Sequence, residues 1–354
     1  MRKVGACFGA LVGAAALGIA GTAPVGAATA ATVSKPIVQG FAGPLQFAVG
    51  ANGNFVVGQD FAGTLTVANP ASRKDLVSRP GKEIAGVDVT DGWIVFGGGG
   101  TDKKPASTLE RWSSGTGVQQ VADLLGFERS HNPDQVNTYG FVPRLSQSCA
   151  SQWPTKQQGP PTYTGVIDSH AYSVRVTHAG YFVGDAAGND ILLVQPSGAI
   201  RVVSVLPPQP HTITAAEAKA NHAPACVAGH TYDFEPVPTD VEMGNDGYLY
   251  VSTLPGGPEG PSLGARGSVY RVNPSNGSAT RLATGLDGAV NVAVTPSGQV
   301  YATELFGGAV DHIVNGHAVR IATVKDPAGL EYANGKLYVS WDVMGNGKIS
   351  TVNI

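Results

Sequence analysis

Five polar side chains that could bind a metal or a ligand stand near the ends of short apolar runs. They are Asp168, Asp185, Asp240, Asn291 and Glu304. Carboxylate and amide oxygens are the ligands that Ca²⁺ and Mg²⁺ prefer in proteins. Buried acids also accept hydrogen bonds from backbone amides without any catalytic role. The spacing alone leaves both interpretations open.

His170 is the residue best placed to carry a proton in a reaction. It precedes an apolar run, so the strand predicted there would position its ring. Histidine titrates near neutral pH and serves as an acid, a base or a metal ligand. Four further histidines lie in or beside two long insertions, where we expect solvated surface positions: His131, His211, His222 and His230.

Several catalytic motifs are missing from the sequence. No H-E-x-x-H occurs, which disfavours a zinc protease. The one G-x-S-x-G match, Gly260–Gly264, follows a Pro/Gly-rich stretch and not the apolar strand that a nucleophile elbow requires. The glycines at 97–100 lack the following GK[ST] of a phosphate-binding loop. The motifs therefore do not establish whether the chain is an enzyme.

A repeated unit supplies the elements that would position these side chains. The stretch Val290–Leu305 has two alternating apolar runs around the turn Ser297-Gly298. Comparable hairpins surround five other turns: Asn52-Gly53, Asp91-Gly92, Ala179-Gly180, Asp246-Gly247 and Asn334-Gly335. Two further apolar runs follow most hairpins. Four strands in each of six units predict an all-β, six-bladed β-propeller. A β-sandwich is the alternative.

The two ends of the chain are predicted to complete the last unit together. Residues 327–354 supply only three strands, and Val33–Gln39 resembles a missing fourth one. We expect Val33–Gln39 to pair with the C-terminal hairpin and close the ring, so that residues 33–354 form one domain. The first strand of each blade begins at the face where the second ends. The polar residues above should therefore meet at one mouth of the central channel.

Residues 123–167 and 206–236 are long insertions that should emerge on this same face. Each contains one cysteine, Cys149 or Cys226. A disulfide between them would tie the insertions together, although two separate thiols are the alternative. Loops on a rigid scaffold are common binding surfaces. One short helix is predicted at Thr214–Asn221, where Thr214 and Glu217 have the spacing of a capping box.

Residues 1–28 have the pattern of a secretory signal peptide. Arg2-Lys3 precede the apolar run Val4–Ala20, and small residues follow. A membrane anchor is the alternative, but we expect a secreted, extracellular bacterial monomer without a membrane span. The chain has 23 basic and 26 acidic residues, and loss of Arg2 and Lys3 makes it more acidic. Nucleic acid is therefore a poor partner.

Segments along essentially the whole mature chain resemble the ScyD/ScyE family, among them Val121–Leu124, Asp168–Tyr172, Val183–Leu192, Val203–Pro208, Pro238–Val241 and Val269–Val272. The resemblance implies an exported, NHL-like six-bladed propeller. The family name comes from pigment-biosynthesis clusters in cyanobacteria, and most members have no assigned role. The family usually reads Asp-Ser-Asn-Pro-Tyr where this chain has Asp168–Tyr172 with His170-Ala171 at its centre. A ligand shared by the family is therefore in doubt here.

Three hypotheses follow. The first is a binding or interaction module that uses the disulfide-tied insertions to hold a small molecule or a protein. The second is a lactonase or lyase dependent on Ca²⁺ or Mg²⁺, with Asp168, Asp240, Asn291 and Glu304 as ligands and His170 as proton carrier. The third is a purely structural envelope protein. The sequence names no certain cofactor.

Overall fold

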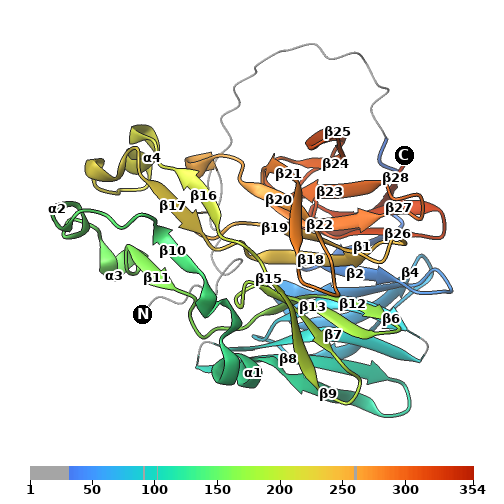
Figure 1. Ribbon diagram of the computed structural model, residues 1–354. Helices are drawn as coiled ribbons and strands as arrows, with labels where there is room; N and C mark the ends of the chain where they lie inside the picture. The colour runs from blue at the N-terminus through green and yellow to red at the C-terminus, as the bar shows by residue number, and fades with distance from the viewer. Residues whose placement is uncertain (1–31, 91, 102, 259–260) are drawn as a thin grey trace.

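The computed structural model describes residues 32–90, 92–101, 103–258 and 261–354. The predicted signal peptide lies outside these residues. The described chain is built mainly from short antiparallel strands, with a group of small helices at one side (Figure 1). No helix in the described part is long and apolar enough to cross a membrane.

Five four-stranded sheets each consist of consecutive strands. The first contains β2 (Gln46–Val49), β3 (Phe55–Gln59), β4 (Thr64–Asn69) and β5 (Ser72–Ser78). The second contains β6 (Ile84–Thr90), β7 (Trp93–Thr101), β8 (Lys104–Ser113) and β9 (Gly117–Asp123). The third contains β12 (Ala171–Thr177), β13 (Gly180–Asp185), β14 (Asp190–Val194) and β15 (Ile200–Val205). The fourth contains β18 (Pro238–Met243), β19 (Leu249–Thr253), β20 (Gly267–Val272) and β21 (Ala279–Leu286). The fifth contains β22 (Ala289–Val294), β23 (Val300–Glu304), β24 (Ala309–Val314) and β25 (His317–Thr323).

The sixth sheet joins the two ends of the described chain. It contains β26 (Leu330–Ala333), β27 (Lys336–Trp341), β28 (Gly347–Val352) and β1 (Val38–Phe41). β1 pairs antiparallel with β28, with Val38 opposite Ile349. Upstream of β1, Val33 bridges Val352. The N-terminal segment thus pairs with the C-terminal hairpin, although its regular strand begins later than the predicted Val33–Gln39.

Turn chemistry accounts for the hairpins inside these sheets. Asn334 and Gly335 between β26 and β27 have φ values of 51° and 74°. Two consecutive positive φ values are required by a type I′ turn, whose twist matches that of paired strands, and Asn-Gly adopts them readily. Alternating apolar side chains on both sides of such turns then face the neighbouring sheets.

Successive sheets pack face to face through their apolar side chains. The first strands contact one another in the order β2, β6, β12, β18, β22 and β26, and β26 also contacts β2. A buried cluster joins Phe55 and Val57 of the first sheet to Tyr338 and Ile349 of the sixth. Complete burial of one such side chain contributes about 1.5–3 kcal/mol. Each sheet therefore depends on both neighbours.

The two insertions form a seventh sheet, which the sequence did not predict. It contains β11 (Thr162–Thr164), β10 (Thr138–Phe141), β17 (Thr231–Phe234) and β16 (Gln209–Thr212). Short helices accompany it: α1 (Leu124–His131), η2 (Pro133–Val136), α2 (Gln147–Ala150), α3 (Thr155–Gln158), α4 (Ala215–Ala220) and η3 (Ala225–Val227). Two further 3₁₀ turns come from the blades: η1 (Asp60–Ala62), which follows β3, and η4 (Pro261–Leu263), which contacts α4.

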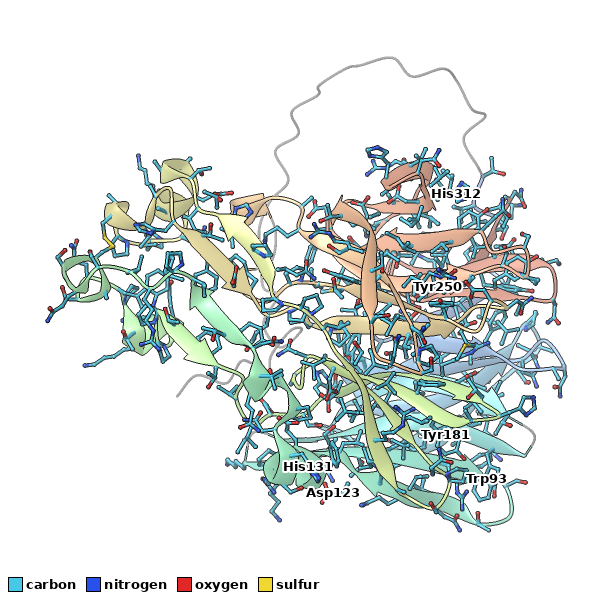
Figure 2. All side chains as sticks on the ribbon, viewed as in Figure 1. Trp93, Asp123, His131, Tyr181, Tyr250 and His312 are labelled. Carbon is cyan, nitrogen blue, oxygen red and sulfur yellow. A yellow bond between two sulfur atoms is a disulfide. The ribbon has the colours of Figure 1, made fainter. Side chains whose placement is uncertain are left out.

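Side-chain caps explain where two of these helices begin. Thr214 and Glu217 form the predicted capping box of α4. α1 was not predicted. Asp123 precedes it and accepts a hydrogen bond from the Gly126 N–H at 2.9 Å, while His131 is its last residue (Figure 2).

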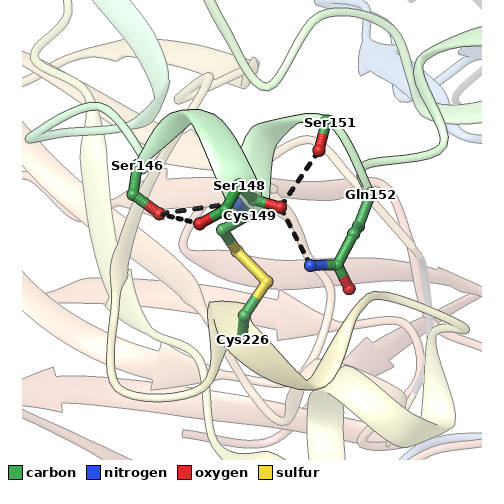
Figure 3. Close-up of a disulfide and its surroundings, with 6 residues drawn as sticks. All are labelled: Ser146, Ser148, Cys149, Ser151, Gln152 and Cys226. Carbon is green, nitrogen blue, oxygen red and sulfur yellow. Dashed lines mark hydrogen bonds between the residues drawn. A yellow bond between two sulfur atoms is a disulfide. The ribbon is translucent and has the colours of Figure 1, made fainter.

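The predicted disulfide is confirmed. Cys149 of α2 is bonded to Cys226 of η3, and their Cα atoms lie 5.9 Å apart (Figure 3). The bond joins the two insertions across 77 residues of sequence. It packs in a buried cluster with Phe141, Trp153 and Phe234.

The double substitution of Cys149 and Cys226 by alanine should lower the free energy of unfolding by about 2–4 kcal/mol, because the open chain gains conformational entropy. Urea denaturation of the oxidised protein and the variant measures this difference. Hydrogen exchange should show the loss of protection at β10 and β17. Equal stability of the two proteins would contradict a structural role for the bond.

Candidate functional site

The rim of the propeller face that bears the insertions carries a chain of three titratable side chains from three sheets. His170 precedes β12, Glu83 precedes β6, and Asp60 begins η1 after β3. The Nε2 atom of His170 lies 2.6 Å from Oε2 of Glu83. Glu83 in turn shares a hydrogen bond with Asp60.

Charge and burial set the protonation of this chain. Burial lowers the pKa of His170, but the charge and hydrogen bond of Glu83 outweigh this, so the pKa is raised. Burial raises the pKa of Asp60 well above its usual value, and the adjacent Glu83 adds to this effect. These shifts favour the proton-bearing forms of Asp60 and His170 on either side of the Glu83 carboxylate, whose own pKa would be raised by burial but is lowered by His170. The end of the second strand in the first unit indicated Asp60 as a residue of this face, but sequence reasoning missed Glu83. Glu83 immediately precedes β6 as His170 precedes β12, and this shared position could have indicated that the two side chains lie close together.

Asp185 and Asp168 lie beside His170. The Asp185 carboxylate accepts hydrogen bonds from the backbone N–H of His170 at 2.6 Å and from the backbone N–H of Gly188 at 3.0 Å. The half-buried Asp168 accepts from the Ser169 N–H at 3.0 Å. Asp185 therefore fixes the backbone that leads into β12. The structure brings three of the predicted residues together here.

Asp240 and Asn291 stand on neighbouring inner strands, where they join successive sheets. The Oδ2 atom of Asp240 accepts from the Val292 N–H at 3.0 Å. The Oδ1 atom of Asn291 accepts from the Leu330 N–H at 2.9 Å. Burial, followed by the charge of Glu242, raises the pKa of Asp240 well above its usual value. Both side chains thus connect one inner strand to the next.

Glu304 belongs to a different cluster at the end of β23. Its Oε2 atom accepts from the Asp287 N–H at 2.7 Å. Its side chain also hydrogen-bonds Asp311, and burial together with this contact raises the pKa of Asp311 to about 8. Within the described ranges, no three His, Cys, Asp or Glu side chains stand close enough together to hold a metal ion.

A buried apolar layer lies at the starts of the inner strands, where a polar channel mouth was expected. Residues within two positions of all six starts contribute to it: Leu45, Ala85, Tyr172, Val237, Val290 and Ala328. Gln46 of β2 reaches the Thr239 carbonyl of β18 at 3.0 Å. Apolar packing is favoured here because the first strand of every blade begins at this level, so that side chains from six strands meet around the axis and exclude water.

A second group of buried acids was also missed. Glu128 of α1, Asp134 of η2 and Asp190 of β14 come from separate elements and are almost fully buried. Burial, with the charges of Asp185, Asp134 and Asp168, raises the pKa of Glu128 to about 8. Neither carboxylate oxygen of Asp190 has a hydrogen-bond partner among the described residues. Burial and then the charge of Asp185 raise the pKa of Asp190 well above its usual value.

The insertions and the loop between β19 and β20 border a cavity of about 260 Å³. Its walls are mainly apolar and aromatic: Phe141, Trp153, Ile213, Val227, Tyr232 and Phe234. Ring pairs stiffen these walls, since Phe141 meets Trp153 and Tyr232 edge-on at centroid distances of 5.1 and 5.0 Å. Gln158, Glu217 and Asn221 supply polar groups. Small-molecule sites combine apolar walls with a few polar groups in this way. The sequence indicated this face but not these residues.

Comparisons with solved structures establish the fold class. The luciferin-regenerating enzyme is 9% identical, with coverage of 92% of this chain and 95% of that chain and a TM-score of 0.54. The PQQ-bound aldose sugar dehydrogenase of Streptomyces coelicolor is 11% identical, with coverage of 91% and 97% and a TM-score of 0.51. A streptogramin B lyase is 15% identical, with coverage of 92% and 98% and a TM-score of 0.50. No protein-family model and no curated protein matches the sequence.

These similarities, together with the packed four-stranded sheets, make the chain a β-propeller protein. At 9–15% identity they concern the fold alone.

Glu83→Gln should lower the pKa of His170, because it removes the negative charge that stabilises the imidazolium. NMR titration of the histidine ring protons measures this shift, with His170→Asn used to assign the signal. We expect a decrease of at least about one unit, the scale that an adjacent opposite charge produces. An unchanged His170 titration would contradict the ion pair.

Asp190→Asn should flatten the decline of stability with rising pH. A carboxyl whose pKa is raised by folding stabilises the folded state fully below its unfolded pKa of about 3.9, and that contribution falls as pH rises toward the folded pKa. For one such carboxyl, the free energy of unfolding decreases by at most about 1.4 kcal/mol per pH unit. Urea denaturation at pH 5 and pH 8 should show a smaller pH difference in the variant. Identical slopes would contradict the buried, unpartnered state of Asp190.

Proposed function

We propose that the protein is an exported binding module built on a closed six-bladed propeller. The support for six blades is the contact order of the inner strands, which returns from β26 to β2. The support for closure is β1, which adds the fourth strand to the last sheet. Residues 33–354 are then one domain that buries its sheet faces internally and is stable as a monomer. Export through residues 1–28 and membership of the ScyD/ScyE family complete this proposal.

The proposed role is to bind a small apolar molecule in the cavity between the insertions. The cavity is the observation that carries this proposal, since two segments distant in sequence are folded together and cross-linked around it. The disulfide and the edge-on ring pairs hold the walls in place before a ligand arrives. Preorganised walls lower the entropic cost of binding.

The alternative of a lactonase or lyase dependent on Ca²⁺ or Mg²⁺ is not favoured. Asp240, Asn291 and Glu304 accept hydrogen bonds from backbone amides at separate places. The apolar layer beside Tyr172 occupies the level at which an axial substrate would meet His170. The His170–Glu83 pair instead supports the loop that enters β12.

Ala218→Leu tests the binding role, because Ala218 is buried in α4 and lines the cavity. Ala220→Leu on the exposed side of the same helix is the matched control. In a thermal-shift screen of small aromatic compounds, ligands should stabilise the wild type and Ala220→Leu. A compound at 100 times its Kd adds about 2.7 kcal/mol.

The same compounds should lose their effect in Ala218→Leu, while circular dichroism confirms that this variant is folded. Stabilisation that persists in Ala218→Leu would move the site elsewhere. A screen in which no compound stabilises the wild type would contradict the proposed function.

A further inference from the structure

The rings that line the cavity favour a flat ligand. Trp153, Tyr232 and Phe234 come from both insertions and pack against one another, with Tyr232 and Phe234 centroids 4.5 Å apart. Aromatic side chains gain most from another ring that stacks with an offset or meets them edge-on. A volume of about 260 Å³ suits one or two fused rings. The walls therefore favour a small, flat ligand.

The polar edge of the cavity offers acceptors to a ligand. The Gln158 Nε2 atom donates to the Asn221 carbonyl at 3.1 Å. The Asn221 Nδ2 atom donates to the carbonyls of Glu217 and Ser262 at 2.9 and 3.4 Å. Because backbone carbonyls accept only, these contacts fix which way both amides point. Their oxygens, Oε1 of the exposed Gln158 and Oδ1 of the half-buried Asn221, accept no hydrogen bond from the described part of the chain and are free to accept one from a ligand at the cavity edge.

Glu217 is the charged side chain among the described residues that line the cavity, and Arg266 interacts with it electrostatically from beside the Phe234 wall. Burial would raise the pKa of Glu217, but hydrogen bonds from the Thr214 backbone and hydroxyl and from His211 lower it, so the carboxylate is ionised. Its Oε2 atom accepts a hydrogen bond from the Thr214 N–H at 2.7 Å, and its Oε1 atom lies 2.9 Å from the Nε2 atom of His211. Arg266 stacks over the Phe234 ring at 4.3 Å, but it donates to the carbonyls of Gly256 and Pro258. Among the described lining residues, only Glu217 carries a formal charge.

We infer that the cavity selects a flat aromatic molecule that carries a hydrogen-bond donor, an amine above all, and discriminates against aromatic carboxylates. The inference rests on the proposed function and names its ligand class. A donor on the ligand satisfies the oxygens of Gln158 and Asn221. A ligand carboxylate would place a second anion near Glu217 and leave acceptors facing acceptors, which is costly in a largely apolar cavity.

Tryptamine, indole and indole-3-acetate test this inference because they share one ring system and differ in the attached group. Isothermal titration calorimetry at pH 7.5 should show tryptamine binding at least tenfold more tightly than indole-3-acetate, with indole between them. In Glu217→Gln, the affinities for tryptamine and indole-3-acetate should differ by less than threefold, since glutamine keeps the capping position but removes the charge. Ala218→Leu should abolish binding of all three probes, and Ala220→Leu should bind as the wild type does.

Equal affinities for tryptamine and indole-3-acetate, tighter binding of the acetate, or no binding of any probe would overturn the inference. An unchanged ratio in Glu217→Gln would also overturn the role assigned to its charge. The proposed function has a separate outcome. If other aromatic compounds stabilise the wild type but not Ala218→Leu, the cavity remains a binding site and only the ligand class is wrong.

Discussion

The packing of one sheet face against the next is the interaction on which the rest of the structure depends. A four-stranded sheet with apolar side chains on both faces is unstable alone, and each blade buries those faces only between two neighbours. The cluster that joins Val57 to Ile349 does this between the first and last sheets. The pairing of Val38 with Ile349 completes the last sheet. The insertions can therefore stand on a scaffold whose ends are held together.

Polar side chains on the inner strands reinforce this packing. Asp88 accepts from the Val176 N–H at 2.7 Å, and Asp240 and Asn291 make the equivalent contacts between later strands. A side chain on one inner strand thus replaces a backbone partner that the next strand cannot find within its own sheet. Residues that resemble metal ligands in the sequence serve here to join blades. The binding site that we propose therefore lies at the insertions and not at the axis.

The sequence predicted what short-range patterns determine. Alternation and turn residues located the strands, the Thr214–Glu217 spacing located α4, and the two insertion cysteines are bonded as expected. The seventh sheet was missed because its strands come from segments far apart, and β10 is only four residues long. Glu83 and the cavity were missed for a related reason. Their neighbours are set by the order of the sheets in space, which no local spacing reveals.

A crystal structure of the protein soaked with tryptamine tests the central claim most directly, because it shows where a ligand binds. The account predicts density for the indole ring in the cavity beside Trp153, Tyr232 and Phe234, with the amine near the side-chain oxygens of Gln158 and Asn221. Density beside His170 at the channel, with the insertion cavity empty, would contradict it.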